Sequence, residues 1–150
     1  MHLSELLTLD RIACNLPAQS KKRALEELSE LISHADPMVT TNEVFDSLLA
    51  RERLGGTGVG YGVAIPHGRL KNTEKTIAAF ISLQDAIDFD ALDNQRVDLL
   101  FALIVPENST QEHLQILASI AGMFNDEAMR EKLRQATSSE ELYQLISDWH

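Results

Sequence analysis

The chain has 150 residues, which predicts one domain spanning residues 1–150 and a core of substantial size. Hydrophobic residues make up 44% and charged residues 24%, a composition that excludes disordered and fibrous proteins. The formal net charge of −10 argues against nucleic acid or an acidic membrane face as a partner and favours a basic protein.

The N-terminal segment and the cysteine content indicate a cytoplasmic protein. The start MHLSELLTLD lacks the basic and then apolar regions of a signal peptide. Cys14 is the sole cysteine, so no internal disulfide can form. The longest wholly apolar run, residues 99–105, is far shorter than the roughly 20 residues that cross a bilayer, so direct membrane insertion is not expected.

Apolar residues at helical spacing predict two helices in the first third of the chain. The first covers residues 20–35, with Ser20 as its N-cap. The second begins at the capping-box pattern Thr40-x-x-Glu43 and ends at Gly55, where a glycine supplies the C-terminal cap.

Two strands are predicted further along the chain, at residues 76–83 and 97–105. The second has near-continuous apolar character, which is typical of a central strand buried on both faces. A third helix is then expected, opened by Ser109-x-x-Glu112. Its apolar stripe comprises Leu114, Leu117, Ala121 and Phe124.

The C-terminal part predicts two shorter helices. They cover about residues 127–135 and 142–149, and the second follows the box Ser138-x-x-Glu141. Strands alternating with helices indicate an α/β domain.

The distribution of glycine singles out one segment. Six of the seven glycines lie between positions 55 and 68. No lysine follows any of them, and their spacing does not fit the dinucleotide-binding pattern, so ATP or NAD binding is disfavoured. Glycines still permit a tight backbone whose N–H groups point at an anion.

His67 supplies a reactive neighbour for such a backbone. It ends a short extended segment after Pro66 and precedes Gly68. Neutral imidazole is a nucleophile near physiological pH and can accept a phosphoryl group. Residues 51–71 contain four cationic side chains against one anionic side chain, which indicates an anion site.

Each of these features also has a purely structural explanation when taken alone. A glycine-rich turn is often only a turn, and an arginine at a helix C-terminus often only complements the helix dipole. His113, in the first turn of the third helix, is either a surface residue or a functional partner of His67. The sequence alone leaves both interpretations open.

Longer stretches carry a resemblance to a known family. The segments ARERLGGTGVGYGVAIPHGR and VDLLFALIVPENSTQEHLQIL resemble the mannitol/fructose-type enzyme IIA domain of the bacterial phosphotransferase system. QSKKRALEELSELI and ATSSEELYQLI are most similar to its nitrogen-regulatory branch. The resemblance implies an α/β fold with a mixed β-sheet flanked by helices.

The resemblance also implies a role for three residues. His67 would accept a phosphoryl group on Nε2, giving a tele-phosphohistidine, from a histidine-containing phosphocarrier protein. Arg51 stands at the active-site arginine, and His113 at a second histidine that supports the first. This chemistry requires no metal and no cofactor.

An anion cradle around the phosphoryl group is expected beside these three residues. Together with Arg51, the loop N–H groups are expected to hold the phosphoryl oxygens. The expected binding residues are Gly58, Gly60, Gly62, Gly68 and Arg69.

The expected output is regulation of other proteins according to phosphorylation state, with potassium transporters and sensor kinases as the targets that the family implies. The nearest alternative is a carbohydrate-specific IIA component that passes phosphate from His67 to a sugar-permease IIB domain. A metal-binding or hydrolytic enzyme built on His67 and His113, and a binding module that only senses an anion, are further alternatives.

Overall fold

The computed structural model describes residues 2–149. Its strands are β1 (Ile12–Leu16), β2 (Gly58–Gly60), β3 (Val63–Ala64), β4 (His67–Leu70), β5 (Ile77–Ile87) and β6 (Val97–Pro106). Its α-helices are α1 (Lys21–Ser33), α2 (Thr41–Leu54), α3 (Gln111–Phe124), α4 (Glu127–Gln135) and α5 (Ser139–Asp148). Two short 3-10 helices, Leu3–Leu6 and Leu9–Arg11, precede β1.

All the strands belong to one mixed sheet with β6 in its interior. β6 pairs with β5 in antiparallel fashion and with both β3 and β4 in parallel fashion. β1 lies parallel to β5 at one side, and β2 lies antiparallel to β3 at the other. The mixed sheet confirms the predicted fold class, and β6 is the central strand that its apolar sequence predicted.

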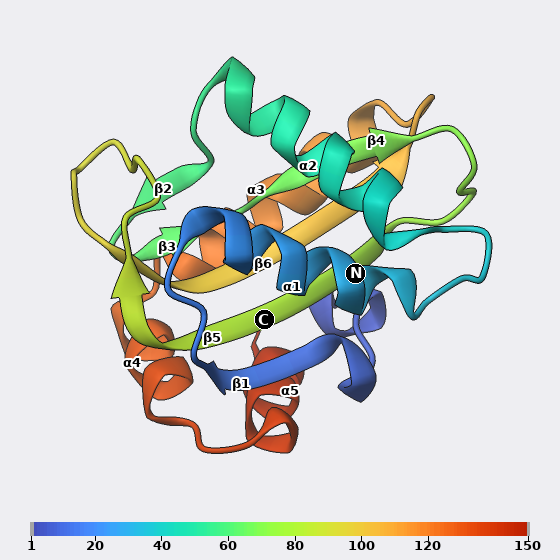
Figure 1. The fold of residues 1–150 in the computed structure, drawn as a ribbon. Coiled ribbons are helices and arrows are strands. Elements are labelled where there is room, and N and C mark those ends of the chain that lie inside the picture. Colours follow the sequence, from blue (N-terminus) through green and yellow to red (C-terminus); the bar gives the residue numbers. More distant parts are fainter. Residues whose placement is uncertain (1, 150) are drawn as a thin grey trace.

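Helices cover both faces of the sheet. α1 and α2 lie on one face, and α3, α4 and α5 lie on the other (Figure 1). Successive residues of β6 alternate between the two layers, so that Phe101 packs with α3 to α5 and Ala102 packs with α1 and α2. Successive side chains of a strand point to opposite faces of the sheet. Because both faces of β6 are covered by helices, its side chains are apolar in both directions.

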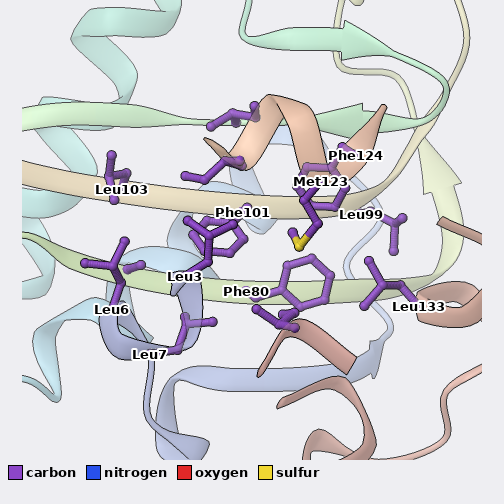
Figure 2. Packing of buried hydrophobic residues seen from close by; sticks show 14 of the residues in the cluster. Leu3, Leu6, Leu7, Phe80, Leu99, Phe101, Leu103, Met123, Phe124 and Leu133 are labelled. Atoms are coloured by element: carbon purple, nitrogen blue, oxygen red, sulfur yellow. The ribbon is translucent and has the colours of Figure 1, made fainter. Parts of the chain in front are cut away.

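Three aromatic rings anchor the core under α3. Phe80, Phe101 and Phe124 lie with ring centroids 6.1 to 6.3 Å apart. Figure 2 labels the three residues within this layer of the core. All three are nearly inaccessible to solvent. Burying one such side chain stabilises the fold by about 1.5–3 kcal/mol, so this cluster fixes α3 firmly on the sheet.

The helix caps confirm much of the sequence prediction. The hydroxyls of Ser20, Thr40 and Ser138 each accept the backbone N–H three residues ahead. α4 has the predicted bounds, whereas α5 begins at Ser139, directly after its cap and earlier than predicted. No helix within residues 2–149 is long and apolar enough to span a membrane.

The start of α3 differs from the prediction. The helix begins at Gln111 with Thr110 as its N-cap and no side-chain capping bond, so the predicted box Ser109-x-x-Glu112 does not form. Glu107 and Ser109 lie in the preceding loop, where their carbonyl oxygens accept hydrogen bonds from Arg69 Nη1.

The buried face of α3 is also rotated relative to the predicted stripe. It consists of His113, Ile116, Ile120, Met123 and Phe124. Leu114 is 64% exposed, and Ala121 is exposed as well. Of the predicted stripe, only Phe124 is fully buried and Leu117 partly so.

Candidate functional site

His67 is the first residue of β4 and lies directly against the central strand, paired with Leu103 of β6. Its ring is half-buried, and Nδ1 lies 2.8 Å from the carbonyl oxygen of Ile65. A carbonyl oxygen can only accept a hydrogen bond, so Nδ1 carries the proton. In the neutral ring, Nε2 is therefore the nitrogen with the reactive electron pair.

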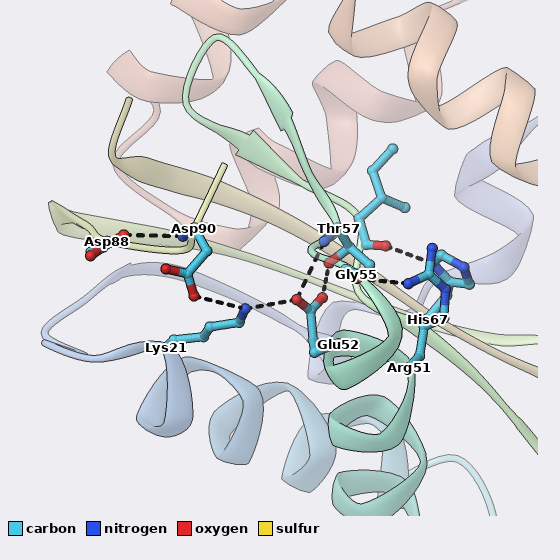
Figure 3. A network of polar contacts seen from close by, with 9 residues as sticks. Lys21, Arg51, Glu52, Gly55, Thr57, His67, Asp88 and Asp90 are labelled. Atoms are coloured by element: carbon cyan, nitrogen blue, oxygen red, sulfur yellow. Dashed lines mark hydrogen bonds and ion pairs between the residues drawn. The ribbon is translucent and has the colours of Figure 1, made fainter. Parts of the chain in front are cut away.

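Arg51 reaches the same place from the last turn of α2. Its Nη1 donates to the carbonyl oxygen of Gly55 at 2.7 Å. Figure 3 shows the guanidinium beside the His67 ring. Because arginine has five N–H donors, one hydrogen bond to Gly55 leaves others for an anion.

Close packing of α2 on β4 makes this approach possible. A Cβ atom at Gly68 would overlap the hydroxyl of Ser47 on α2. That hydroxyl donates to the carbonyl oxygen of Arg69 at 2.9 Å. Gly68 therefore serves the site by letting the helix that carries Arg51 lie close to the strand that carries His67.

His113 enters from the first turn of α3, on the other side of β4. Its ring centroid lies 5.7 Å from that of His67, with the two planes tilted by 56°. The residue is 7% exposed, and its Nδ1 has no hydrogen-bond partner within residues 2–149. The structure thus gives His113 the inward orientation on which its functional interpretation depended.

Arg69 holds the loop before α3 in place. Its guanidinium donates to Glu107 and Ser109, as described for the start of that helix, and it lies two residues after His67. The side chain therefore ties β4 to the segment that sets the position of His113.

A cleft of about 740 Å³ joins these groups. It lies between α2, β4 and α3, and its walls include Arg51, His67, Gly68, Arg69 and His113. Five of the eight residues expected from the sequence are thus brought together at one place.

The other three glycines lie elsewhere. Gly58 packs against Ala91, where a Cβ atom would come within 2.8 Å of that residue's own Cβ. Gly60 and Gly62 have positive φ angles at the turn between β2 and β3, near Asp93 and Asp98. None of the three lines the cleft, and they belong to a hairpin that packs against residues 91–98.

Burial favours the neutral form of both imidazoles. The pKa of His67 lies below its usual value, mainly because burial disfavours the charged ring and also because Arg51 and Arg69 are near, while the bond to Ile65 acts in the opposite direction. The pKa of His113 is lowered by burial and then by His67 and Arg69. His67 is therefore available as a neutral nucleophile down to lower pH than an ordinary histidine.

Two residues of the site were missed by the sequence interpretation. Glu52 is buried, and its carboxylate accepts hydrogen bonds from both the backbone N–H and the hydroxyl of Thr57. One signal for this burial was present, because Glu52 continues the stripe of Val44 and Leu48 at four-residue spacing.

Among residues 2–149, no group of three or more His, Cys, Asp or Glu is arranged to hold a metal ion.

Comparison with known proteins decides the family. Residues 5–149 match the family described as "Phosphoenolpyruvate-dependent sugar phosphotransferase system, EIIA 2". The chain belongs to this EIIA 2 family. The match confirms the resemblance read from the sequence.

Relatives within the EIIA 2 family point to its nitrogen-regulatory type. The nitrogen regulatory protein of Pseudomonas aeruginosa is 45% identical over 148 residues, covering 99% of this chain and 96% of that protein. The crystal structure of nitrogen regulatory protein IIA-Ntr from Neisseria meningitidis has 41% identity and a TM-score of 0.90, covering 96% of this chain and 98% of that one.

A solved structure with a mannitol name is similar to a lower degree. IIA mannitol from Escherichia coli has 26% identity and a TM-score of 0.78, covering 93% of this chain and 98% of that chain. The fold is thus common to both types, whereas the sequence is more similar to the nitrogen regulatory relatives.

Proposed function

We propose that this protein is a phosphoryl carrier that accepts a phosphoryl group on Nε2 of His67. The observation that carries the proposal is the hydrogen bond from Nδ1 of His67 to Ile65, which leaves Nε2 as the nucleophilic nitrogen in a cleft that also contains Arg51 and His113. Membership of the EIIA 2 family supports the same chemistry.

The donor is a histidine-containing phosphocarrier protein. The phosphorus–nitrogen bond of its phosphohistidine breaks as the bond from phosphorus to Nε2 of His67 forms. The electron pair leaves with the donor ring, and no proton has to move in this step. Since the donor is already activated, the protein contributes alignment and stabilisation of charge on the three phosphoryl oxygens.

Arg51 and His113 provide that stabilisation. The guanidinium of Arg51 lies beside the acceptor ring and offers N–H donors in a planar arrangement that suits phosphoryl oxygens (Figure 3). For His113, we assign the proton to Nε2, because Nδ1 is buried without a partner and a buried N–H without an acceptor is costly. Nε2–H then donates to a phosphoryl oxygen on His67.

Arg69 and Gly68 have secondary roles in this proposal. Arg69 adds positive charge at the cleft wall while holding the loop before α3. Gly68 lies beside the phosphorylated residue and keeps α2 close. The remaining glycines of the predicted cradle take no part.

The output is regulation of partner proteins according to phosphorylation state. Phosphorylation adds about −1.5 to −2 charges to a cleft that is otherwise cationic, and such a change alters which surfaces can bind there. The nitrogen regulatory relatives support this output. Potassium transporters and sensor kinases are the proposed targets, and the proposed role places the protein in the cytoplasm.

A carbohydrate-specific IIA component is the second candidate. Its support is the similarity to IIA mannitol from Escherichia coli. In that case, the phosphoryl group of His67 would pass to a IIB domain and drive sugar uptake. Mixing the phosphorylated protein with candidate IIB domains, and following the loss of its phosphoryl group, separates the two functions.

Intact-mass measurement tests the shared first step. The protein is incubated with phosphoenolpyruvate, the first enzyme of the system and each candidate carrier protein. Wild type is expected to gain one acid-labile phosphoryl group, and His67→Ala none. His34→Ala, which changes an exposed histidine at the end of α1, is the matched control and is expected to be phosphorylated like wild type. A wild-type protein that gains no mass contradicts the proposal.

A further inference from the structure

A buried carboxylate lies directly behind the Arg51 and His67 pair and is not explained by the roles assigned so far. The side chain of Glu52 is 3% exposed. Its carboxylate lies 2.8 Å from Nζ of Lys21 on α1 and accepts two hydrogen bonds from Thr57. A buried charge is tolerated only when it is paired and hydrogen-bonded, and Glu52 satisfies both conditions.

The partner of this carboxylate occupies an unusual position. Lys21 is the first residue of α1, where a positive charge opposes the helix dipole. It contacts Glu52, lies 3.5 Å from Asp90 and places Nζ 4.7 Å from the centroid of the Phe89 ring. These contacts hold the ammonium group where the helix alone would disfavour it.

A continuous line of hydrogen bonds leads from Glu52 to the nucleophile. Thr57 binds the carboxylate through its N–H and hydroxyl, and its carbonyl oxygen accepts the N–H of Ile65 at 3.0 Å. The carbonyl oxygen of Ile65 in turn accepts Nδ1–H of His67. Figure 3 shows the line from Lys21 to Thr57 and the bond at the His67 ring.

The same turn also orients the arginine. Gly55 lies between Glu52 and Thr57, its N–H donates to the carbonyl oxygen of Glu52, and its own carbonyl oxygen accepts Nη1 of Arg51. The 52–57 turn therefore contains the carbonyl group of Gly55, which orients Arg51. It also contains Thr57, whose carbonyl oxygen binds Ile65, the residue that accepts Nδ1–H of His67.

We propose that Glu52 is a positioning residue for phosphoryl transfer, which acts through Thr57 to hold the 52–57 turn and, with it, the carbonyl groups that orient Arg51 and His67. Lys21 is the counter-charge paired with this buried carboxylate. The inference rests on the proposed function, because it assigns Glu52 to that reaction. Glu52 itself does not reach the reacting atoms.

The charge of Glu52 acts on the His67 ring as well. The charged and titratable groups around that ring are Arg51 and Glu52 from α2, Arg69 from β4 and His113 from α3. Glu52 raises the pKa of His67, whereas the two arginines lower it.

Two sets of variants test the proposal. Glu52→Gln keeps the shape and removes the charge, and Glu131→Gln, at an exposed position of α4, is its matched control. Because Glu52→Gln deprives Lys21 of its nearest counter-charge, Thr57→Val and Thr57→Ser form a second set that leaves the ion pair intact. Thr57→Val removes the hydroxyl, and Thr57→Ser restores it. Backbone amide spectra check that each variant is folded.

The readouts separate positioning from mere stability. Nitrogen-15 NMR of the unphosphorylated protein reports which ring nitrogen of His67 carries the proton and at what pH the ring titrates. We expect the Nδ1–H form in wild type, a lower pKa in Glu52→Gln, and a mixture of tautomers in Glu52→Gln and Thr57→Val. Phosphorylation of these two variants is expected to slow by about tenfold or more, since small misplacements of reacting groups are costly. Thr57→Ser and Glu131→Gln should match wild type.

These experiments distinguish a failure of the positioning role from a failure of the proposed phosphoryl-carrier function. If Thr57→Val or Glu52→Gln is folded and keeps the wild-type tautomer, pKa and phosphorylation rate, the positioning role is refuted. If wild type is never phosphorylated, the proposed function fails instead. The NMR arm needs no phosphoryl donor, so it still shows whether Glu52 controls the ring.

Discussion

The imidazole rings of His67 and His113 lie 5.7 Å apart between centroids although the residues are 46 positions apart in the sequence. One ring comes from a strand that pairs with the centre of the sheet, and the other from the first turn of a helix packed on a phenylalanine cluster. Both supports are rigid, which is the requirement for a site that works by alignment. The geometry predicts different effects of removing each group.

Removing His113 is expected to slow phosphorylation without abolishing it. His113→Ala takes away one donor to the phosphoryl oxygens, and loss of one such donor costs about 2.7–4 kcal/mol of barrier, or roughly 10²- to 10³-fold in rate. Rapid-quench sampling followed by intact mass measures this rate. Gln115→Ala, an exposed change on the same helix, is the control. A His113→Ala protein with the wild-type rate contradicts the assigned role.

Arginine at position 51 is expected to be replaceable by neither alanine nor lysine. Arg51→Ala should be phosphorylated slowly but completely, because the nucleophile is intact. Arg51→Lys retains the charge but loses the planar set of donors, so it should recover only part of the rate. Arg53→Ala, in the same turn but exposed, should behave like wild type in the same assay. Equal rates for all four proteins would remove Arg51 from the site.

The lowered pKa values predict how stability depends on pH. His67 and His113 both titrate below the usual value of a histidine, near 6.5, whereas in the unfolded chain they titrate at about that value. Between the two pKa values the unfolded state binds more protons, so the free energy of unfolding rises with pH. The stability that the two histidines contribute is fully present above their pKa in the unfolded chain. It is lost as the pH falls from that value toward their lower pKa in the folded protein.

Urea unfolding between about pH 5 and 8 checks this dependence. His113→Ala should show a flatter curve than wild type over the range in which the histidines titrate, because one of the two contributing groups is gone. An unchanged curve would show that burial of His113 does not disfavour its charged form. His34→Ala, which removes an exposed histidine, is the control.

Gly68→Ala is expected to damage the site by moving a helix. The added methyl group overlaps the hydroxyl of Ser47, so α2 must shift, at a cost of about 1–3 kcal/mol in the free energy of unfolding. Ser47→Ala removes the overlapping oxygen. The double variant should therefore be more stable than the sum of the two single effects predicts. Strict additivity in urea titrations would rule out this contact as the reason for the glycine.

Local signals in the sequence predicted the elements that depend on local chemistry. The caps Ser20, Thr40 and Ser138 appear as predicted because each side chain bonds its own helix. β6 was predictable because a strand buried on both faces is apolar throughout. The resemblance to the family correctly indicated the fold and the family itself.

Features that depend on distant partners were not predictable in the same way. β4 is four residues within a glycine-rich stretch and is a strand only because β6 lies beside it. The buried face of α3 is set by its packing in the core beside the sheet, where Ile116, Ile120 and Phe124 lie, and not by the helix sequence alone. The sequence does not distinguish the three glycines of the β2–β3 hairpin from Gly68. The structure does, because Gly60 and Gly62 have positive φ angles and Gly58 packs against Ala91, whereas Gly68 packs against Ser47 at the cleft.

The central claim is that Nε2 of His67 carries the phosphoryl group. The most direct measurement is the coupling between phosphorus-31 and nitrogen-15 in uniformly nitrogen-labelled protein after phosphorylation by the carrier. The hydrogen bond from Nδ1 to Ile65 predicts that the coupling involves Nε2 of His67, with Nδ1 still protonated. Coupling to Nδ1, or to a nitrogen of any other residue, would contradict the account.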